Sequence, residues 1–117
     1  MSYLLLIHEP RGQRESRTEA EGRAAYQQMV QWGLGLKERG LLLASESLKA
    51  DREGVRLQRR GGRDQLLDGP FSEAREMIGG FFLLACDSRA QALAVASECP
   101  AAAWATVEVR ETGPCFT

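Results

Sequence analysis

The chain has 117 residues, a hydrophobic fraction of 44%, a charged fraction of 26% and a formal net charge of −1. This length predicts a single domain over residues 1–117, and the composition is ordinary for a soluble globular protein. The near-neutral charge gives no general attraction to nucleic acid or anionic membrane, and every apolar run is far shorter than the roughly 20 residues that span a bilayer.

The cysteines favour a reducing compartment. Cys86, Cys99 and Cys115 are odd in number and widely spaced, which fits neither a disulfide framework nor a zinc site. The N-terminus has no basic segment ahead of its apolar run, so we expect no signal peptide. The sequence therefore predicts a cytoplasmic protein, and it contains no motif for a metal or an organic cofactor.

The first half of the chain predicts a strand, a helix and a second strand. Residues 2–7 form an apolar run typical of a buried strand, and residues 11–17 predict a mobile polar loop. Thr18 opens a Thr-Glu-Ala-Glu capping box, so we expect a helix to begin there and to end at Gly40. Residues 41–44 predict the next strand.

The second half predicts a hairpin, a strand, a helix and a last strand. The expected segments are hairpin strands at 54–60 and 63–67, a strand at 79–86, a helix between Ser88 and Pro100, a strand at 106–110 and a tail at 113–117. The hairpin turns at Gly61-Gly62, a pair that favours a tight two-residue turn. Its arginines have no interleaved aromatic residues, so we expect a solvated face and no nucleic acid.

The order of these elements is β-α-β, an inserted hairpin, then β-α-β. This order predicts an α+β fold, a ferredoxin-like βαββαβ sandwich whose two helices cover one face of an antiparallel sheet. The strands have the apolar content of strands buried on both faces, and two helices cover only one. We therefore expect a second copy of the chain to cover the other face in a homodimer.

The stretch between the hairpin and the next strand has a distinctive local pattern. Asp68-Gly69 favours a turn, and Pro70 ends any strand because it lacks an N–H. Ser72 is expected to cap a helical turn over Glu73 to Met77. A rigid loop of this kind can simply join two elements, or it can hold a carboxylate at the mouth of a pocket.

This stretch resembles a known signature. Asp68-Gly69-Pro70-Phe71, followed by Ser-Glu-Ala-Arg-Glu and a Gly-Gly-Phe strand, is similar to the signature of the DGPF proteins, a branch of the YCII-related family. Ala74 and Arg75 stand where that signature commonly has Thr and Lys. The resemblance extends to the opening strand at 3–7, the segment 40–48 and the last strand at 107–110.

The resemblance implies a dimeric α/β barrel, in which two sheets pack face to face. It also implies a pocket between the helices and the sheet, rimmed by the Asp68 loop, Glu46 and His8. DGPF proteins resemble one another in often being encoded beside extracytoplasmic-function sigma factors. An accessory regulatory role in such a system is therefore one implication.

Asp68 and His8 are the candidate catalytic residues. Asp68 is either a general acid or base or a turn-forming residue whose oxygens accept backbone hydrogen bonds. His8 is the only histidine, and it is either a pocket residue or a plain strand end. A histidine–aspartate pair proposed as catalytic in YCII-related proteins has its histidine on the first helix, where Ala24 to Gln28 contain none, so motif matching gives His8 no such role.

The candidate ligand-binding residues surround the same loop. They are Glu46, Phe71, Glu73, Arg75 and Glu76. Glu73 and Glu76 are three apart, so on a helical turn they share a face and can do acid–base work or hold a cation. The alternative is a solvated turn in which Arg75 balances the neighbouring carboxylates.

Two classes of function remain open. The first is a small-molecule-binding or accessory regulatory protein with a pocket near the Asp68 loop. The second is a cofactor-independent enzyme that uses Asp68 as general acid or base in lyase-like or oxygenase-like chemistry. The missing helix histidine favours the first class.

Overall fold

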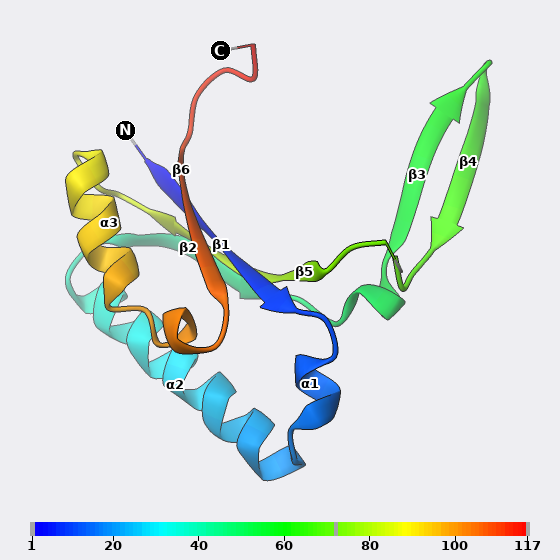
Figure 1. Ribbon diagram of the computed structural model, residues 1–117. Helices are drawn as coiled ribbons and strands as arrows, with labels where there is room; N and C mark the ends of the chain where they lie inside the picture. The colour runs from blue at the N-terminus through cyan, green and yellow to red at the C-terminus, as the bar shows by residue number, and fades with distance from the viewer. Residues whose placement is uncertain (1, 72, 117) are drawn as a thin grey trace.

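The computed structural model describes residues 2–71 and 73–116, and it has the predicted α+β composition (Figure 1). In chain order the elements are β1 (Tyr3–Pro10), α1 (Gln13–Ser16), α2 (Glu19–Glu38), β2 (Leu42–Ser47), η1 (Asp51–Glu53), β3 (Val55–Arg60), β4 (Arg63–Asp68), β5 (Glu76–Leu84), α3 (Arg89–Ser97), η2 (Pro100–Ala103) and β6 (Thr106–Glu111). Among these residues, none of the helices combines the length and hydropathy needed to cross a bilayer.

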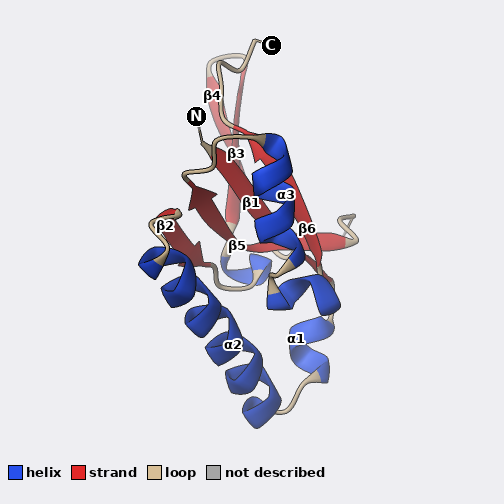
Figure 2. Cartoon of the chain, turned by 90° about the vertical axis from the view of Figure 1, so that its left-hand side faces the viewer, coloured by secondary structure: helices blue, strands red, loops and turns tan. Residues whose placement is uncertain are grey.

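Four strands form one antiparallel sheet in the order β2-β5-β1-β6, while β3 and β4 form a separate hairpin. Helices α2 and α3 lie on the same face of the sheet (Figure 2). We call this the inner face. The arrangement is compatible with the predicted ferredoxin-like fold, and the inserted hairpin is present.

The core lies between the inner face and the two helices. Leu5 of β1, Leu84 of β5, Leu36 of α2 and Val95 of α3 are all fully buried there. Burying side chains of this size is the main source of stability for a small domain. The glycine Gly33 brings α2 close to the sheet, because a Cβ there would lie 3.4 Å from the Phe82 ring.

The opposite face of the sheet, called the outer face here, carries an apolar patch that is only partly buried. Alternation along β1 turns Leu4 and Leu6 away from the helices, and the strand register places Leu83 and Phe81 beside them. In contrast, the neighbouring inward residues of β1 are buried. The second apolar face expected from the sequence is therefore present.

Two local predictions were wrong. Strand β1 continues past Ile7 to Pro10 because its last three residues pair with the start of β5 across a bulge. The helical turn predicted over Glu73 to Met77 does not form, and Glu76 already begins β5. The physical reason is cross-strand bonding: the Arg75 carbonyl accepts the Arg11 backbone N–H at 3.0 Å. Ser72, the predicted cap, lies outside the described residues.

The helix starts follow the predicted chemistry. Thr18 and Glu21 form the complete capping box: the Thr18 side chain accepts the Glu21 N–H, and the Glu21 carboxylate accepts the Thr18 N–H. Ser88 caps α3 by accepting the Gln91 N–H. The Gln91 side chain in turn accepts the Asp87 N–H. The polar segment at 11–17 contains the short helix α1 rather than loop alone.

The hairpin β3–β4 projects away from the rest of the chain (Figure 1). Every residue of both strands is exposed. The register pairs Leu57 with Leu66, and alternation places Val55 on the same side as this pair. One side of the projecting hairpin therefore carries an apolar patch that, within this chain, no described residue covers.

Candidate functional site

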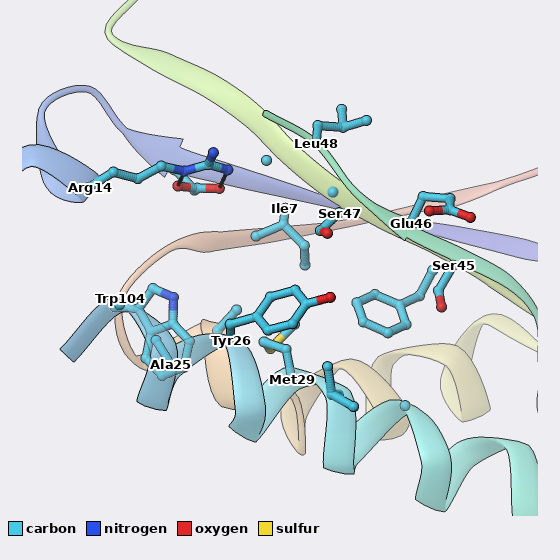
Figure 3. Close-up of a pocket in the computed structure, with 18 of the residues that line it drawn as sticks. Ile7, Arg14, Ala25, Tyr26, Met29, Ser45, Glu46, Ser47, Leu48 and Trp104 are labelled. Carbon is cyan, nitrogen blue, oxygen red and sulfur yellow. Dashed lines mark hydrogen bonds and ion pairs between the residues drawn. The ribbon is translucent and has the colours of Figure 1, made fainter. Parts of the chain in front are cut away.

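A cavity of about 810 Å³ lies between α2 and the inner face of the sheet (Figure 3). From α2, Tyr26 and Met29 point toward the sheet, which contributes Ile7 and Phe82 to the opposite wall. Trp104, just after η2, closes one end. This volume and this mostly apolar lining are typical of small-molecule sites in proteins.

An ion pair with a buried carboxylate forms part of the cavity wall. Glu9 is only 8% exposed, and Arg14 of α1 donates two hydrogen bonds to it, from Nε to Oε1 at 2.8 Å and from Nη2 to Oε2 at 2.7 Å. The hydrogen bonds to Glu9 raise the pKa of the Arg14 guanidinium. The bidentate geometry fixes the orientation of Arg14 and leaves its Nη1 group outside the pair.

Gly79 of β5 makes this ion pair possible. A Cβ at this position would overlap Glu9 Oε2, and it would lie 3.0 Å from Arg14 Nη2. Glycine in a strand interior often marks such a close approach. The pair of glycines that precedes Phe81 therefore has a packing role here: Gly79 leaves room for a buried carboxylate.

Cations outnumber carboxylates in the cavity lining. The cations are Arg14, Arg17, Lys37 and Lys49, and the carboxylates are Glu9 and Glu46. The Arg17 guanidinium stacks on the Trp104 ring at 5.5 Å from its centroid. Among the described residues, no carboxylate lies within ion-pair distance of Arg17, Lys37 or Lys49.

A second arginine of the same segment holds the Asp68 loop. Arg11 pairs with Asp51 through two contacts, Nη1 to Oδ1 at 3.1 Å and Nη2 to Oδ2 at 2.5 Å. It also donates to the carbonyl oxygens of Phe71, at 3.0 Å, and Ala74, at 2.7 Å. The hydrogen bonds from Arg11 lower the pKa of Asp51.

The loop is also packed from its other side. The Arg56 guanidinium lies 3.8 Å from the centroid of the Phe71 ring, a cation–π contact. Gly69 lies so close to η1 that a Cβ there would overlap the Asp51 carbonyl oxygen. The Asp68 loop is thus fixed against residues 51–56. Arg11, just before α1, holds the loop, and Arg14 of α1 lines the cavity.

The remaining predicted residues of the loop lie outside the cavity. Asp68 is exposed at the end of β4, and the described residues donate no hydrogen bond to its carboxylate. Glu73, Arg75 and Glu76 are also exposed. The structure therefore groups Phe71 with Arg11, Asp51 and Arg56, and it does not bring the predicted carboxylates together around one pocket.

Glu46 is the one predicted residue that lines the cavity. Its neighbours Ser45 and Ser47 pair with the inward Phe82 and Gly80, whereas Glu46 pairs with Phe81 on the outer side. Figure 3 shows Ser45 directed toward α2 and Glu46 directed away from it. Glu46 therefore contributes at the edge of the cavity rather than in its centre.

His8 lies on the outer face, where it has a carboxylate partner. Its Nε2 lies 2.7 Å from Glu108 Oε1, and Arg110 Nε donates to Glu108 Oε2 at 2.8 Å. Because a carboxylate can only accept, the His8 Nε2–H is the donor. The hydrogen bonds from His8 and Arg110 lower the pKa of Glu108. His8 and the cavity thus lie on opposite faces of the sheet.

Several residues of these clusters were missing from the sequence-based set. Glu9 is on the inner face by alternation from Tyr3, but this follows only if the strand continues past His8. Gly79 was a usable signal, because glycine in a buried strand indicates a large neighbouring group. Glu108 and Asp51 had no signal, since the partner of Glu108 is 100 residues away in the sequence and the partner of Asp51 is 40 residues away.

The fold and this cavity define a small α+β protein with an antiparallel sheet and a pocket, partly open to solvent, between the sheet and α2. A sequence model of the YCII-related domain matches residues 1–114. Because the match covers nearly the whole chain, the chain belongs to the YCII-related family. No curated protein matches it.

We expect Asp51→Asn to loosen the Asp68 loop and Asp68→Asn to leave it unchanged. The first substitution removes the charge that Arg11 binds and weakens a charge-assisted pair. The second changes an exposed carboxylate that accepts no hydrogen bond from the described residues. Hydrogen exchange of the Phe71 and Ala74 amides, measured by NMR, should be about tenfold faster in the Asp51 variant than in the unaltered protein. Equal exchange in the two variants would contradict this account of the loop.

We expect Gly79→Ala to destabilise the protein by about 2 kcal/mol or more, because the new methyl group displaces Glu9 and breaks a buried ion pair. The measurement is urea unfolding. Gly35→Ala is the matched control: a Cβ at position 35 meets nothing within 4 Å, and alanine favours the helix. If Gly79→Ala is as stable as the control, Glu9 does not need the space that Gly79 provides.

Proposed function

We propose that this YCII-related protein binds a small molecule in the cavity between α2 and the inner face of the sheet. The observation that carries the proposal is the cavity itself, with about 810 Å³ of space and a mostly apolar wall. Close packing normally fills the space between a helix and a sheet with side chains. Here a space remains, and Gly22 of α2, where a Cβ would meet nothing within 4 Å, is among the residues that line it.

An oriented polar group beside an apolar wall also supports binding. Arg14 is held by Glu9, so its position does not depend on the ligand, and pre-organised groups of this kind lower the entropy cost of binding. The alternative, an enzyme with Asp68 as general acid or base, has less support. Asp68 is exposed at the base of the hairpin and does not line the cavity.

We expect Ala25→Trp to fill the cavity and Ala24→Trp to leave it open. Ala25 lines the cavity, while its neighbour Ala24 is exposed on the other side of α2. The probe is 1-anilinonaphthalene-8-sulfonate, whose fluorescence rises in apolar sites. It should saturate one site per chain, and Ala25→Trp should weaken its binding about tenfold, the scale of losing much of an apolar contact surface. Equal binding by both variants would place the probe elsewhere and contradict the proposal.

We also propose that the protein is a homodimer whose outer sheet faces pack together, as in a dimeric α/β barrel. The support is the apolar outer face, with Leu4, Leu6, Phe81 and Leu83 only partly buried within one chain. Contiguous exposed apolar surface commonly marks an interface between proteins. The apolar side of the projecting hairpin offers further surface to the same partner.

We expect light scattering to give a dimer mass for the protein at micromolar concentration and a monomer mass for Leu6→Glu. A charge placed on the outer face would lose its hydration in the interface without a partner. Leu93→Glu is the control, because Leu93 lies on the exposed side of α3, away from the outer face. A monomer mass for the unaltered protein would contradict the homodimer.

A further inference from the structure

We infer that the ligand of the cavity is an organic anion, with an apolar body and a carboxylate held between Arg14, Arg17 and Lys49. This inference rests on the proposed function, since it specifies the chemistry of the molecule that the same cavity binds. It follows from where the charged groups lie along the cavity.

The cavity is polar at one end and apolar along its length. Arg14 and Lys49 lie at the same end, because both also line a smaller adjoining cavity of about 370 Å³. Arg17 directly follows α1, which carries Arg14, and it stacks on Trp104 at this end. Lys37 is in the last turn of α2, roughly 30 Å along a helix of 20 residues, so it belongs to the opposite end.

The charge of this end is positive after its own ion pairs are counted. Glu9 is neutralised by Arg14, which makes a bidentate pair with it. Glu15 lies nearby, and Arg52 pairs with it at 3.0 Å. Glu53 lines only the smaller cavity. Arg17 and Lys49 thus remain without an ion pair among the described residues, at the same end as an arginine of fixed orientation.

These groups match a carboxylate better than other head groups. The Nη1 group of Arg14 is not used in its pair with Glu9, and the Arg17 guanidinium, 5.5 Å from the centroid of the Trp104 ring, has no carboxylate within ion-pair distance among the described residues. Such donors favour a planar anion. The apolar body would then lie along Tyr26 and Met29 toward Phe82. A cationic or neutral head group would leave the positive end without a partner.

The test compares three probes that share one body and one planar shape: 2-naphthoate, 2-naphthamide and 2-naphthamidine. Binding is measured by titration calorimetry on the full chain at low ionic strength. We expect 2-naphthoate to bind at least tenfold more tightly than 2-naphthamide, with 2-naphthamidine the weakest, because only the first is an anion. Equal binding of the first two would overturn the inference.

The charged groups are tested with Arg17→Gln and Lys49→Gln, compared with Arg23→Gln. Arg23 is an exposed residue of α2 that pairs with Glu19 and does not line the cavity. Each of the first two substitutions should weaken 2-naphthoate about tenfold and leave 2-naphthamide unchanged, while the control changes neither. A loss in the control as large as in the other two would show that only the overall charge matters, and would overturn the inference.

These measurements distinguish a wrong ligand charge from a wrong binding site. If 2-naphthamide binds as well as 2-naphthoate, and Ala25→Trp abolishes the binding of both, the cavity is a binding site and only the anionic character is wrong. If all three probes fail to bind, or bind equally to Ala25→Trp and to the unaltered protein, the proposed function itself is wrong.

Discussion

The ion pair between Glu9 and Arg14 is the interaction on which the site depends. It joins the end of β1 to α1, and it exists because Gly79 leaves space for the carboxylate in β5. A buried carboxylate without a partner would be costly, so Arg14 is held in one orientation. The segment that carries Arg14 also carries Arg17. One pair of residues therefore fixes the orientation of the arginine at the positive end of the cavity.

The loop around Asp68 is bound to the same segment of the chain, through Arg11. Arg11 binds Asp51 and two carbonyl oxygens of the loop. Arg14, three residues later in the sequence, binds Glu9. Asp51 begins the short helix that follows Lys49. The Asp-Gly-Pro-Phe stretch thus anchors the two segments that line the positive end of the cavity, the one with Arg14 and the one with Lys49. The outer face, with His8 and Glu108, is a separate surface on the other side of the sheet.

Local patterns in the sequence predicted most of the fold but only part of the site. The capping box at Thr18, the Gly61-Gly62 hairpin and the apolar strands act over a few residues, so each could be read directly. The turn predicted after Pro70 failed because pairing with Pro10 and Arg11 overrides the local preference. The partners Arg11–Asp51 and His8–Glu108 depend on strand order, which no local pattern encodes. Glu46 was expected from the family resemblance and its place at a strand end, and it lies at the edge of the cavity.

The central claim is that the helix-covered cavity, and not the outer face or the hairpin, is the binding site. The most direct measurement is an NMR titration of the protein with 2-naphthoate that follows the backbone amides of glycine. Gly33, Gly79 and Gly80 line the cavity, whereas Gly61 and Gly62 form the hairpin turn. We expect saturable shifts for Gly33, Gly79 and Gly80. We expect none for Gly61 and Gly62. Shifts confined to the hairpin, or no saturable shift at the three cavity glycines, would contradict the central claim.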